Sequence, residues 1–311
     1  MYKSISITVL VGCMLLSLTS CVGDDLSNCP TVERLRIRFI NGLSENANPI
    51  QHYDVSQLAD VFIFDSQGMF YRRLSDINTV MTADYVMETT LPAGTYSFVS
   101  WLNLQSCYEI EPAEFQVNQT HINDALLHLS LDASNMVNTA PHLLFHGIQK
   151  EIEITGDYQD IEIPVVPDNY QVNFKVTGPL WVGINYQFNV QASNGIYKFD
   201  NSFAPCQEFD YRYTVSPDEN NVLYASLRFM RLFRDRNPML TITNRYTGDC
   251  IYKHNLVDLI LLLEKKLGVK IDFSRDYVFD IELDLRGDEE TADMEAFITI
   301  NGWRVWDEEN V

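Results

Sequence analysis

Two histidines that lie four residues apart are the first side chains whose spacing could support metal chemistry. They are His142 and His146, in the segment Pro141-His-Leu-Leu-Phe-His-Gly147. On a helix this spacing can hold zinc, but the segment lacks a helper glutamate and is bracketed by proline and glycine. On a strand the two residues would share a face about 13 Å apart, which is too far for one metal ion. We therefore predict core or strand-edge histidines and no metal site.

Three carboxylates form a second candidate cluster near the C-terminus. Asp280, Glu282 and Asp284 are separated by single apolar residues, so on a strand they share one face. A calcium site needs loop oxygens that converge at about 2.3–2.6 Å, which a flat stripe does not provide. We interpret the stripe as a solvated face that resists aggregation, and residues 288–290 and 307–309 in the same way.

The remaining sequence carries no recognisable catalytic pattern. It contains no nucleophile elbow, phosphate-binding loop, dinucleotide-binding glycine motif, zinc-protease helix or EF-hand. We therefore predict a protein that is not an enzyme and needs no cofactor. The formal net charge of −21 repels phosphate backbones, so we expect no nucleic-acid partner.

The N-terminal segment indicates a different chemistry, namely covalent attachment of lipid. Lys3 precedes an apolar run from Ile5 to Leu18, which is too short for a membrane-spanning helix of about 20 residues. The run ends in Leu18-Thr19-Ser20-Cys21, which is the lipobox pattern of bacterial lipoproteins. We predict cleavage of residues 1–20 and lipidation of Cys21. The alternative is an ordinary secretory signal that happens to contain a cysteine.

Four other cysteines would remain in the exported chain, since Cys13 leaves with the signal. They are Cys29, Cys107, Cys206 and Cys250. An even count in an exported protein permits two disulfides, with three possible connectivities. Because two cysteines lie in each half, we favour the pairs Cys29–Cys107 and Cys206–Cys250. No C-x-x-C motif occurs, so we expect no redox or zinc role.

The elements that must position these residues are mostly strands. Segments in which aromatic and β-branched residues alternate with polar ones recur along the chain, as from Tyr170 and from Tyr277. Short strands without regular helices between them indicate an all-β chain of antiparallel sandwiches. Only residues 120–129 and 255–268 look helical, and Gly268 can cap the second helix.

The best boundary between two domains is the proline-containing segment 164–169. We predict a lipidated tether over residues 21–30, an N-terminal sandwich over residues 31–166 and a C-terminal sandwich over residues 167–311. This division agrees with the usual size of about 150 residues per domain.

Three tryptophans test whether the surface could bind sugar. If exposed together, Trp181, Trp303 and Trp306 could form a platform for a glycan. Tryptophans of a β-domain more commonly lie in its core, and that is what we expect for these three.

Several segments follow one another in a fixed order along nearly the whole exported chain. They are Cys21–Pro30, Asp60–Asp65, Leu91–Asn103, Leu144–Gly147, Leu256–Leu263 and Ile298–Val305. Together with the lipobox and its continuation D-L-S-x-C-P, they resemble the fimbrillin-associated anchor subunits of Bacteroidales-type (type V) pili. The resemblance implies two tandem transthyretin-like β-sandwich domains and a lipid-anchored subunit of the outer membrane, at the base of a pilus.

The same resemblance implies partners and a route to the cell surface. The partners would be the fimbrial shaft subunits (fimbrillins), joined by strand addition, and the outer membrane through the lipid. Asp24 and Asp25 are similar to the acidic signal that sends such lipoproteins to the surface, although two residues separate them from Cys21. Whether the chain accepts a strand or donates its own, from Glu295 to Trp306, stays open. The alternative function is a surface glycan-binding lipoprotein of a polysaccharide-uptake system.

Overall fold

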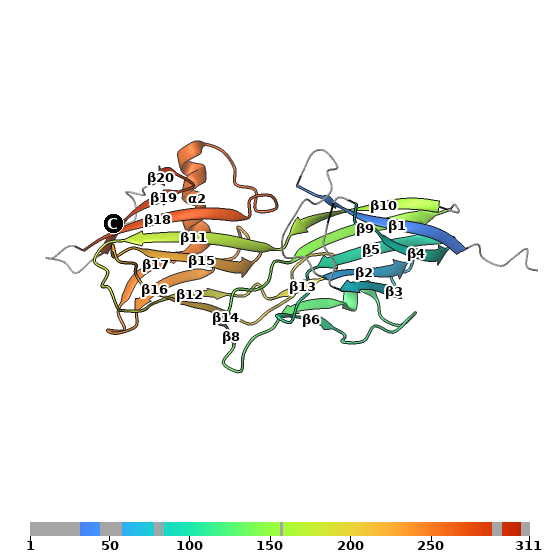
Figure 1. Cartoon of the computed structure of the whole chain (residues 1–311), viewed down its shortest axis with the longest axis horizontal. Coiled ribbons are helices and arrows are strands. Elements are labelled where there is room, and N and C mark those ends of the chain that lie inside the picture. Colours follow the sequence, from blue (N-terminus) through green and yellow to red (C-terminus); the bar gives the residue numbers. More distant parts are fainter. Residues whose placement is uncertain are drawn as a thin grey trace, which may run out of the picture.

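The computed structural model describes residues 32–43, 58–77, 82, 84–155, 158–287 and 294–305. The predicted signal and tether, with Cys21, Asp24, Asp25 and Cys29, lie outside these ranges. The described chain is almost entirely β-structure and forms an elongated molecule with two halves placed end to end (Figure 1). This confirms the predicted all-β fold class.

A seven-stranded sheet, in the order β3-β2-β5-β9-β10-β1-β4, makes up most of the N-terminal half. Its strands are β1 (Val32–Asn41), β2 (Leu58–Asp65), β3 (Phe70–Ile77), β4 (Met87–Pro92), β5 (Gly94–Leu102), β9 (Phe145–Ile154) and β10 (Tyr158–Pro167). The sheet curls around an apolar core that includes Ile37 and Phe98. Its two edge strands therefore meet: Arg72 Nη1 of β3 donates to Thr89 Oγ1 of β4 at 3.1 Å and to Thr90 O at 3.2 Å.

A three-stranded sheet lies against the other face of this curled sheet. It consists of β6 (Tyr108–Glu111), β7 (Leu126–Leu129) and β13 (Ile196–Lys198), in the order β13-β7-β6. The ring of Phe62 in β2 packs on Phe199 at 5.0 Å and on Phe115 at 5.1 Å between ring centres. Because both faces of β2 are covered, every residue between its two ends is buried.

The C-terminal half is a sandwich of two five-stranded sheets, in the orders β15-β11-β18-β19-β20 and β17-β16-β12-β14-β8. The strands are β8 (Met136–Val137), β11 (Asn169–Thr177), β12 (Tyr186–Ala192), β14 (Phe209–Val215), β15 (Leu223–Met230), β16 (Met239–Asn244), β17 (Cys250–Asn255), β18 (Val278–Gly287), β19 (Met294–Ile300) and β20 (Trp303–Val305). Residues of β11 and β12 alternate between buried and more exposed positions, as the period of a strand requires.

The helix predicted over residues 255–268 is confirmed as α2 (Leu256–Leu267). The Asn255 side chain caps its start by accepting from Asp258 N at 2.9 Å. Gly268 ends it in the left-handed conformation, with φ of 67°, which favours glycine. Its apolar face is buried, including Leu259 and Leu263, and the helix lies against β17 and β20.

Two other expectations were wrong in detail. Residues 120–129 form a short 3₁₀ turn, η2 (Ile122–Asp124), followed by strand β7, and do not form a helix. The sheets are also not purely antiparallel, because β1 with β10, β11 with β18, and β14 with β8 run parallel. Alternation in sequence reports which side chains are buried, and it carries no information about strand direction.

The two halves exchange strands across their joint. Strand β8 comes from the N-terminal half of the sequence but pairs with β14, while β13 follows the joint and pairs with β7. One apolar cluster accordingly contains Trp101 and Phe62 together with Tyr170 and Phe229. The predicted boundary falls where β10 leads into β11, and the pairings of β8 and β13 cross this boundary.

Candidate assembly surfaces

The first described strand, β1, begins at one extreme end of the molecule. Strand β1 runs parallel to β10, with Arg34 opposite Tyr158 and Asn41 opposite Val165, and β10 ends at the joint. Figure 1 accordingly shows β1, in blue, beginning at the end farthest from the C-terminal half. Cys21 precedes Val32 by eleven residues, a reach of about 40 Å at most.

The described cysteines are all free thiols, namely Cys107, Cys206 and Cys250. The predicted Cys206–Cys250 disulfide was wrong. Cys250 pairs with Thr243 of β16, and Thr243 lies level with Thr214 of β14, on the other side of β12. Cys206 instead lies just before the opposite end of β14. The length of β14 alone keeps the two cysteines about 17 Å apart, beyond the Cα separation of about 7 Å that a disulfide tolerates.

Cys107, the predicted partner of Cys29, occupies a half-buried position. Its Sγ accepts from His142 N at 3.4 Å, and burial raises the pKa of its thiol. Cys29 lies outside the described residues. The Cys29–Cys107 pair therefore stays a prediction, although Cys107 is a free thiol here.

One of the two histidines, His146, lies in the core as predicted. His146, in β9, is buried, its Nε2 lies 3.0 Å from Phe199 O, and its ring packs on Trp101. Burial lowers the pKa of His146 to about 4, so the ring is neutral near pH 7. His142 is exposed just before β9. In the described ranges no three His, Cys, Asp or Glu side chains come together as metal ligands.

The acidic stripe of β18 is bonded to the neighbouring strand β11. Asn173 Nδ2 donates to Asp280 Oδ1 at 2.7 Å, and Thr177 Oγ1 donates to Asp284 Oδ1 at 3.1 Å. Between them, Lys175 Nζ lies 3.2 Å from Glu282 Oε2. The stripe faces outward as predicted, and its cross-strand contacts fix the parallel register of β11 and β18.

Two of the three singled-out tryptophans are on the surface, contrary to the expectation that they lie in the core. Trp181 is 55% exposed and Trp303 is 53% exposed, while Trp306 lies outside the described residues. Trp181 belongs to the loop between β11 and β12, and Trp303 begins the edge strand β20. Of the tryptophans that the structure describes, Trp101 is the one that lies in the core.

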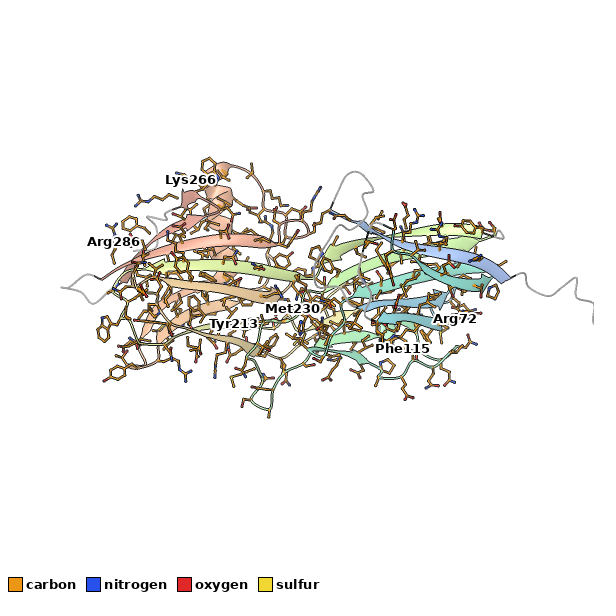
Figure 2. All side chains as sticks on the ribbon, viewed as in Figure 1. Arg72, Phe115, Tyr213, Met230, Lys266 and Arg286 are labelled. Atoms are coloured by element: carbon orange, nitrogen blue, oxygen red, sulfur yellow. The ribbon has the colours of Figure 1, made fainter. Side chains whose placement is uncertain are left out.

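On one side of the C-terminal sandwich, tyrosines of strand β14 cover part of β15, the edge strand of the opposite sheet. Tyr213 OH, from β14, donates to Arg228 O of β15 at 2.7 Å. Tyr211 OH accepts from Met230 N at 3.1 Å. Figure 2 labels Tyr213 in the C-terminal half and Met230 closer to the joint. The half of β15 nearest the joint is therefore closed to backbone pairing with another strand.

The second side of the sandwich is closed by α2, which lies against β17 and β20. Strand β19 pairs with both β18 and β20, and Asn301 and Gly302 form the tight turn of the β19–β20 hairpin with φ of 49° and 78°. The C-terminal strands are thus integrated into the sheet of their own chain. None of the helices in the described part of the chain is long and apolar enough to cross a membrane.

The joint between the halves contains a buried carboxylate that sequence reasoning missed. Asp168 connects β10 to β11, is completely buried, and accepts from Asn201 Nδ2 at 2.9 Å. Arg231 Nε lies 3.8 Å from Asp168 Oδ1. Burial raises the pKa of Asp168 to about 6, against the opposing effect of Arg231. The only signal in the sequence was its place inside the proline-containing boundary segment.

The end of the C-terminal half opposite the joint is formed by loops that carry exposed apolar residues. Strand β11 runs from the joint to Thr177, so the loop 178–185 lies at this distal end, next to the turn 245–249. Trp181, Val182 and Tyr246 project from these two segments, and Tyr246 is 80% exposed. Sequence reasoning missed Tyr246, because turn residues give no sign of whether they contact another protein.

The sequence is similar to a family of fimbrial anchor proteins. The family model of fimbrillin-A associated anchor proteins Mfa1 and Mfa2 matches residues 26–309. The minor fimbrium anchoring subunit Mfa2 of Porphyromonas gingivalis is 23% identical over 277 residues, covering 86% of this chain and 83% of that one.

Solved structures share the fold. The P. gingivalis fimbrial anchor protein Mfa2 superposes with a TM-score of 0.74 at 20% identity, over 88% of this chain and 99% of that one. A proposed polysaccharide-binding protein of Bacteroides thetaiotaomicron gives a TM-score of 0.75 at 22% identity, over 90% of this chain and 100% of that one. Because the family model spans nearly the whole sequence, the chain belongs to the fimbrillin-A associated anchor proteins and is a structural subunit of a fimbria, not an enzyme.

Proposed function

We propose that this chain is the base subunit of a fimbria, held in the outer membrane by lipid on Cys21, facing the cell surface and influencing fimbrial length. Membership of the anchor family carries the proposal. The lipobox before Cys21 and the position of β1 at one extreme end of the molecule support it. A lipid with two or three chains would hold the protein firmly, since each buried CH₂ contributes about 0.8 kcal/mol.

The shaft subunits would join by strand addition, which needs unpaired backbone groups at a sheet edge. In the C-terminal half, tyrosines cover the part of β15 nearest the joint, and α2 lies against β17 and β20. In the N-terminal half, β3 and β4 meet through side chains such as Arg72 and Thr89, without a backbone ladder between them. This β3–β4 seam is the edge where we propose that an incoming strand pairs.

Replacement of the lipidated cysteine tests the proposal directly. Cells that carry Cys21→Ala should release their fimbriae into the medium, with an altered length distribution, because the base subunit no longer has its lipid. Cys13→Ala is the matched control, since it changes a cysteine of the same segment and leaves the lipobox intact. Fimbriae that stay attached to Cys21→Ala cells at unchanged length would refute the anchor function.

A second candidate function, binding of surface glycans, is favoured by one observation. Trp181 and Trp303 are exposed, and exposed indole rings are suitable for stacking on sugars. If this function is correct, Trp181→Ala and Trp303→Ala should each weaken binding of the purified protein to a polysaccharide panel. Unchanged binding in both variants, or no binding by the parent protein, would eliminate it.

A further inference from the structure

Three exposed residues at the distal end, Trp181, Val182 and Tyr246, form what we term the distal patch. They come from two segments that hydrogen bonds hold side by side. Arg245 N donates to Asn185 O at 3.0 Å, which joins the turn 245–249 to the loop 178–185. The loop 178–185 begins beside the end of β18, close to Leu285, and Figure 2 labels the next residue, Arg286.

The backbone under the distal patch is held in place by buried or bonded side chains. Asn244 is buried, and its Oδ1 accepts from Tyr246 N at 2.9 Å and from Thr247 N at 3.2 Å. Trp181 N donates at 3.1 Å to the hydroxyl of Tyr186, which is itself buried. Aromatic side chains on an ordered backbone lose little conformational entropy on binding, which is typical of the residues that dominate protein interfaces.

The location of the patch indicates what it contacts. The predicted tether, residues 21–30, leads to the start of β1 at Val32, whereas the patch lies at the opposite extreme of the elongated molecule. A tether of about 40 Å at most keeps the β1 end close to the lipid, so the patch can face away from the membrane. A fimbria that extends outward from the cell would then meet this end of its base subunit.

We propose that the distal patch is a docking surface for the next protein subunit of the fimbria. The proposal rests on the proposed anchor function and adds a side-chain contact that is separate from the β3–β4 seam, where the strand of a shaft subunit would pair. Trp181 and Tyr246 are the aromatic anchors, and the exposed polar residues beside them, such as Arg245 and Asp249, form a rim. Large exposed apolar side chains on two adjoining loops have an evident use in such a contact.

The test measures binding of the purified full-length protein to fimbriae detached from cells. Trp181→Ala and Tyr246→Ala should each weaken binding about tenfold, and the double variant by more, as expected for interface aromatics. Tyr158→Ala is the control, because Tyr158 is a 53% exposed aromatic residue at the start of β10, near the lipid end. It should bind within about twofold of the parent protein.

Tyr246→Ala keeps the test decisive if Trp181→Ala does not fold, because a side chain that is 80% exposed contributes little to the fold. Wild-type affinity of Tyr246→Ala and of every folded Trp181 variant would overturn the docking proposal. If the patch variants bind normally but Cys21→Ala releases fimbriae, the anchor function stands and only the docking proposal fails. If Cys21→Ala releases no fimbriae, both proposals fail. Loss of polysaccharide binding in the patch variants, with fimbrial binding unchanged, would assign the patch to glycans and likewise overturn the proposal.

Discussion

The two halves of the molecule close their sheets in different ways. In the N-terminal half the edges of one curled sheet meet at β3 and β4, where exposed Arg72 contacts Thr89. In the C-terminal half, the hydroxyls of Tyr211 and Tyr213 bond to the part of β15 nearest the joint on one side, and the apolar face of α2 lies against β17 and β20 on the other. The first closure uses polar contacts near solvent, and the second uses buried surface.

Because of this difference, we expect the free energy needed to separate the sheet edges to be smaller in the N-terminal half than in the C-terminal half. Surface polar contacts stabilise by about 1 kcal/mol or less, whereas burial of a single leucine contributes about 1.5–3 kcal/mol. The β3–β4 seam can therefore open at low cost while the C-terminal sandwich stays intact. Such an arrangement would let one half exchange a strand while the other presents fixed loops to a partner.

The largest expected effect concerns α2. Leu259→Ala should lower the free energy of unfolding by about 2–5 kcal/mol, because Leu259 is completely buried and its truncation leaves a cavity. Urea denaturation would measure the change. Leu261→Ala, on the less buried face of the same helix, should cost clearly less. Equal effects of the two substitutions would mean that α2 does not close the sandwich through its apolar face.

The next effect concerns pH and the joint, where two buried groups act in opposite directions. The pKa of His146 is lowered to about 4, so between pH 6.5 and 4 the unfolded chain binds the extra proton and stability falls as the pH falls. The pKa of Asp168 is raised to about 6, so between pH 6 and 4 the folded chain binds the extra proton and stability rises as the pH falls. The two contributions largely cancel in the native protein.

Single substitutions should separate them. As the pH is lowered from 6.5 to 4, the free energy of unfolding of His146→Gln should rise by roughly 3 kcal/mol relative to that of the parent protein, at about 1.4 kcal/mol per pKa unit. That of Asp168→Asn should fall by a similar amount relative to the parent protein. Thermal or urea unfolding across this range measures both differences. Parallel stability curves for the parent and both variants would show that neither group titrates as its burial requires.

A smaller effect is expected where tyrosine covers the edge of β15. Tyr213→Phe removes the bond to Arg228 O and should cost about 1 kcal/mol in the free energy of unfolding. Tyr224→Phe, on the exposed face of β15 itself, is the matched control and should have no measurable effect. If the two substitutions behave alike in urea denaturation, the phenol of Tyr213 does not stabilise this edge.

The smallest expected change in global stability concerns the seam. Arg72→Ala should change the free energy of unfolding by less than about 1 kcal/mol but should speed hydrogen exchange at amides of β4. Arg286→Ala, an exposed arginine on β18, should leave exchange in β4 unchanged. Unaltered exchange in β4 of Arg72→Ala would show that other contacts hold the seam.

Much of this fold was readable from local patterns. Apolar periodicity and a capping glycine located α2 almost to the residue, because helix ends have strong local signals. The all-β class and the structural role of His146 followed from strand periodicity in the same way. These predictions succeeded because each depended on residues close together in the sequence.

The features that sequence reasoning missed depend on partners far apart in the chain. The Cys206–Cys250 pair was proposed by counting, but the register of β12, β14 and β16 sets the two cysteines at opposite ends of one sheet. Asp168 meets Asn201 and Arg231 only after three separate segments converge at the joint. The exposure of Trp181 and Trp303 likewise depends on which loops the fold leaves uncovered.

The exchange of β8 and β13 also constrains the order in which a growing chain can fold. A chain that emerges N-terminus first produces β8 long before its partner β14, and it produces β6 and β7 before β13. The small sheet of the N-terminal half therefore stays incomplete until residue 198 has emerged, well after the last strand of the seven-stranded sheet. The N-terminal half can therefore be completed only after β11 and β12 of the C-terminal half have already emerged, so the joint between the halves forms before either half can fold to completion alone.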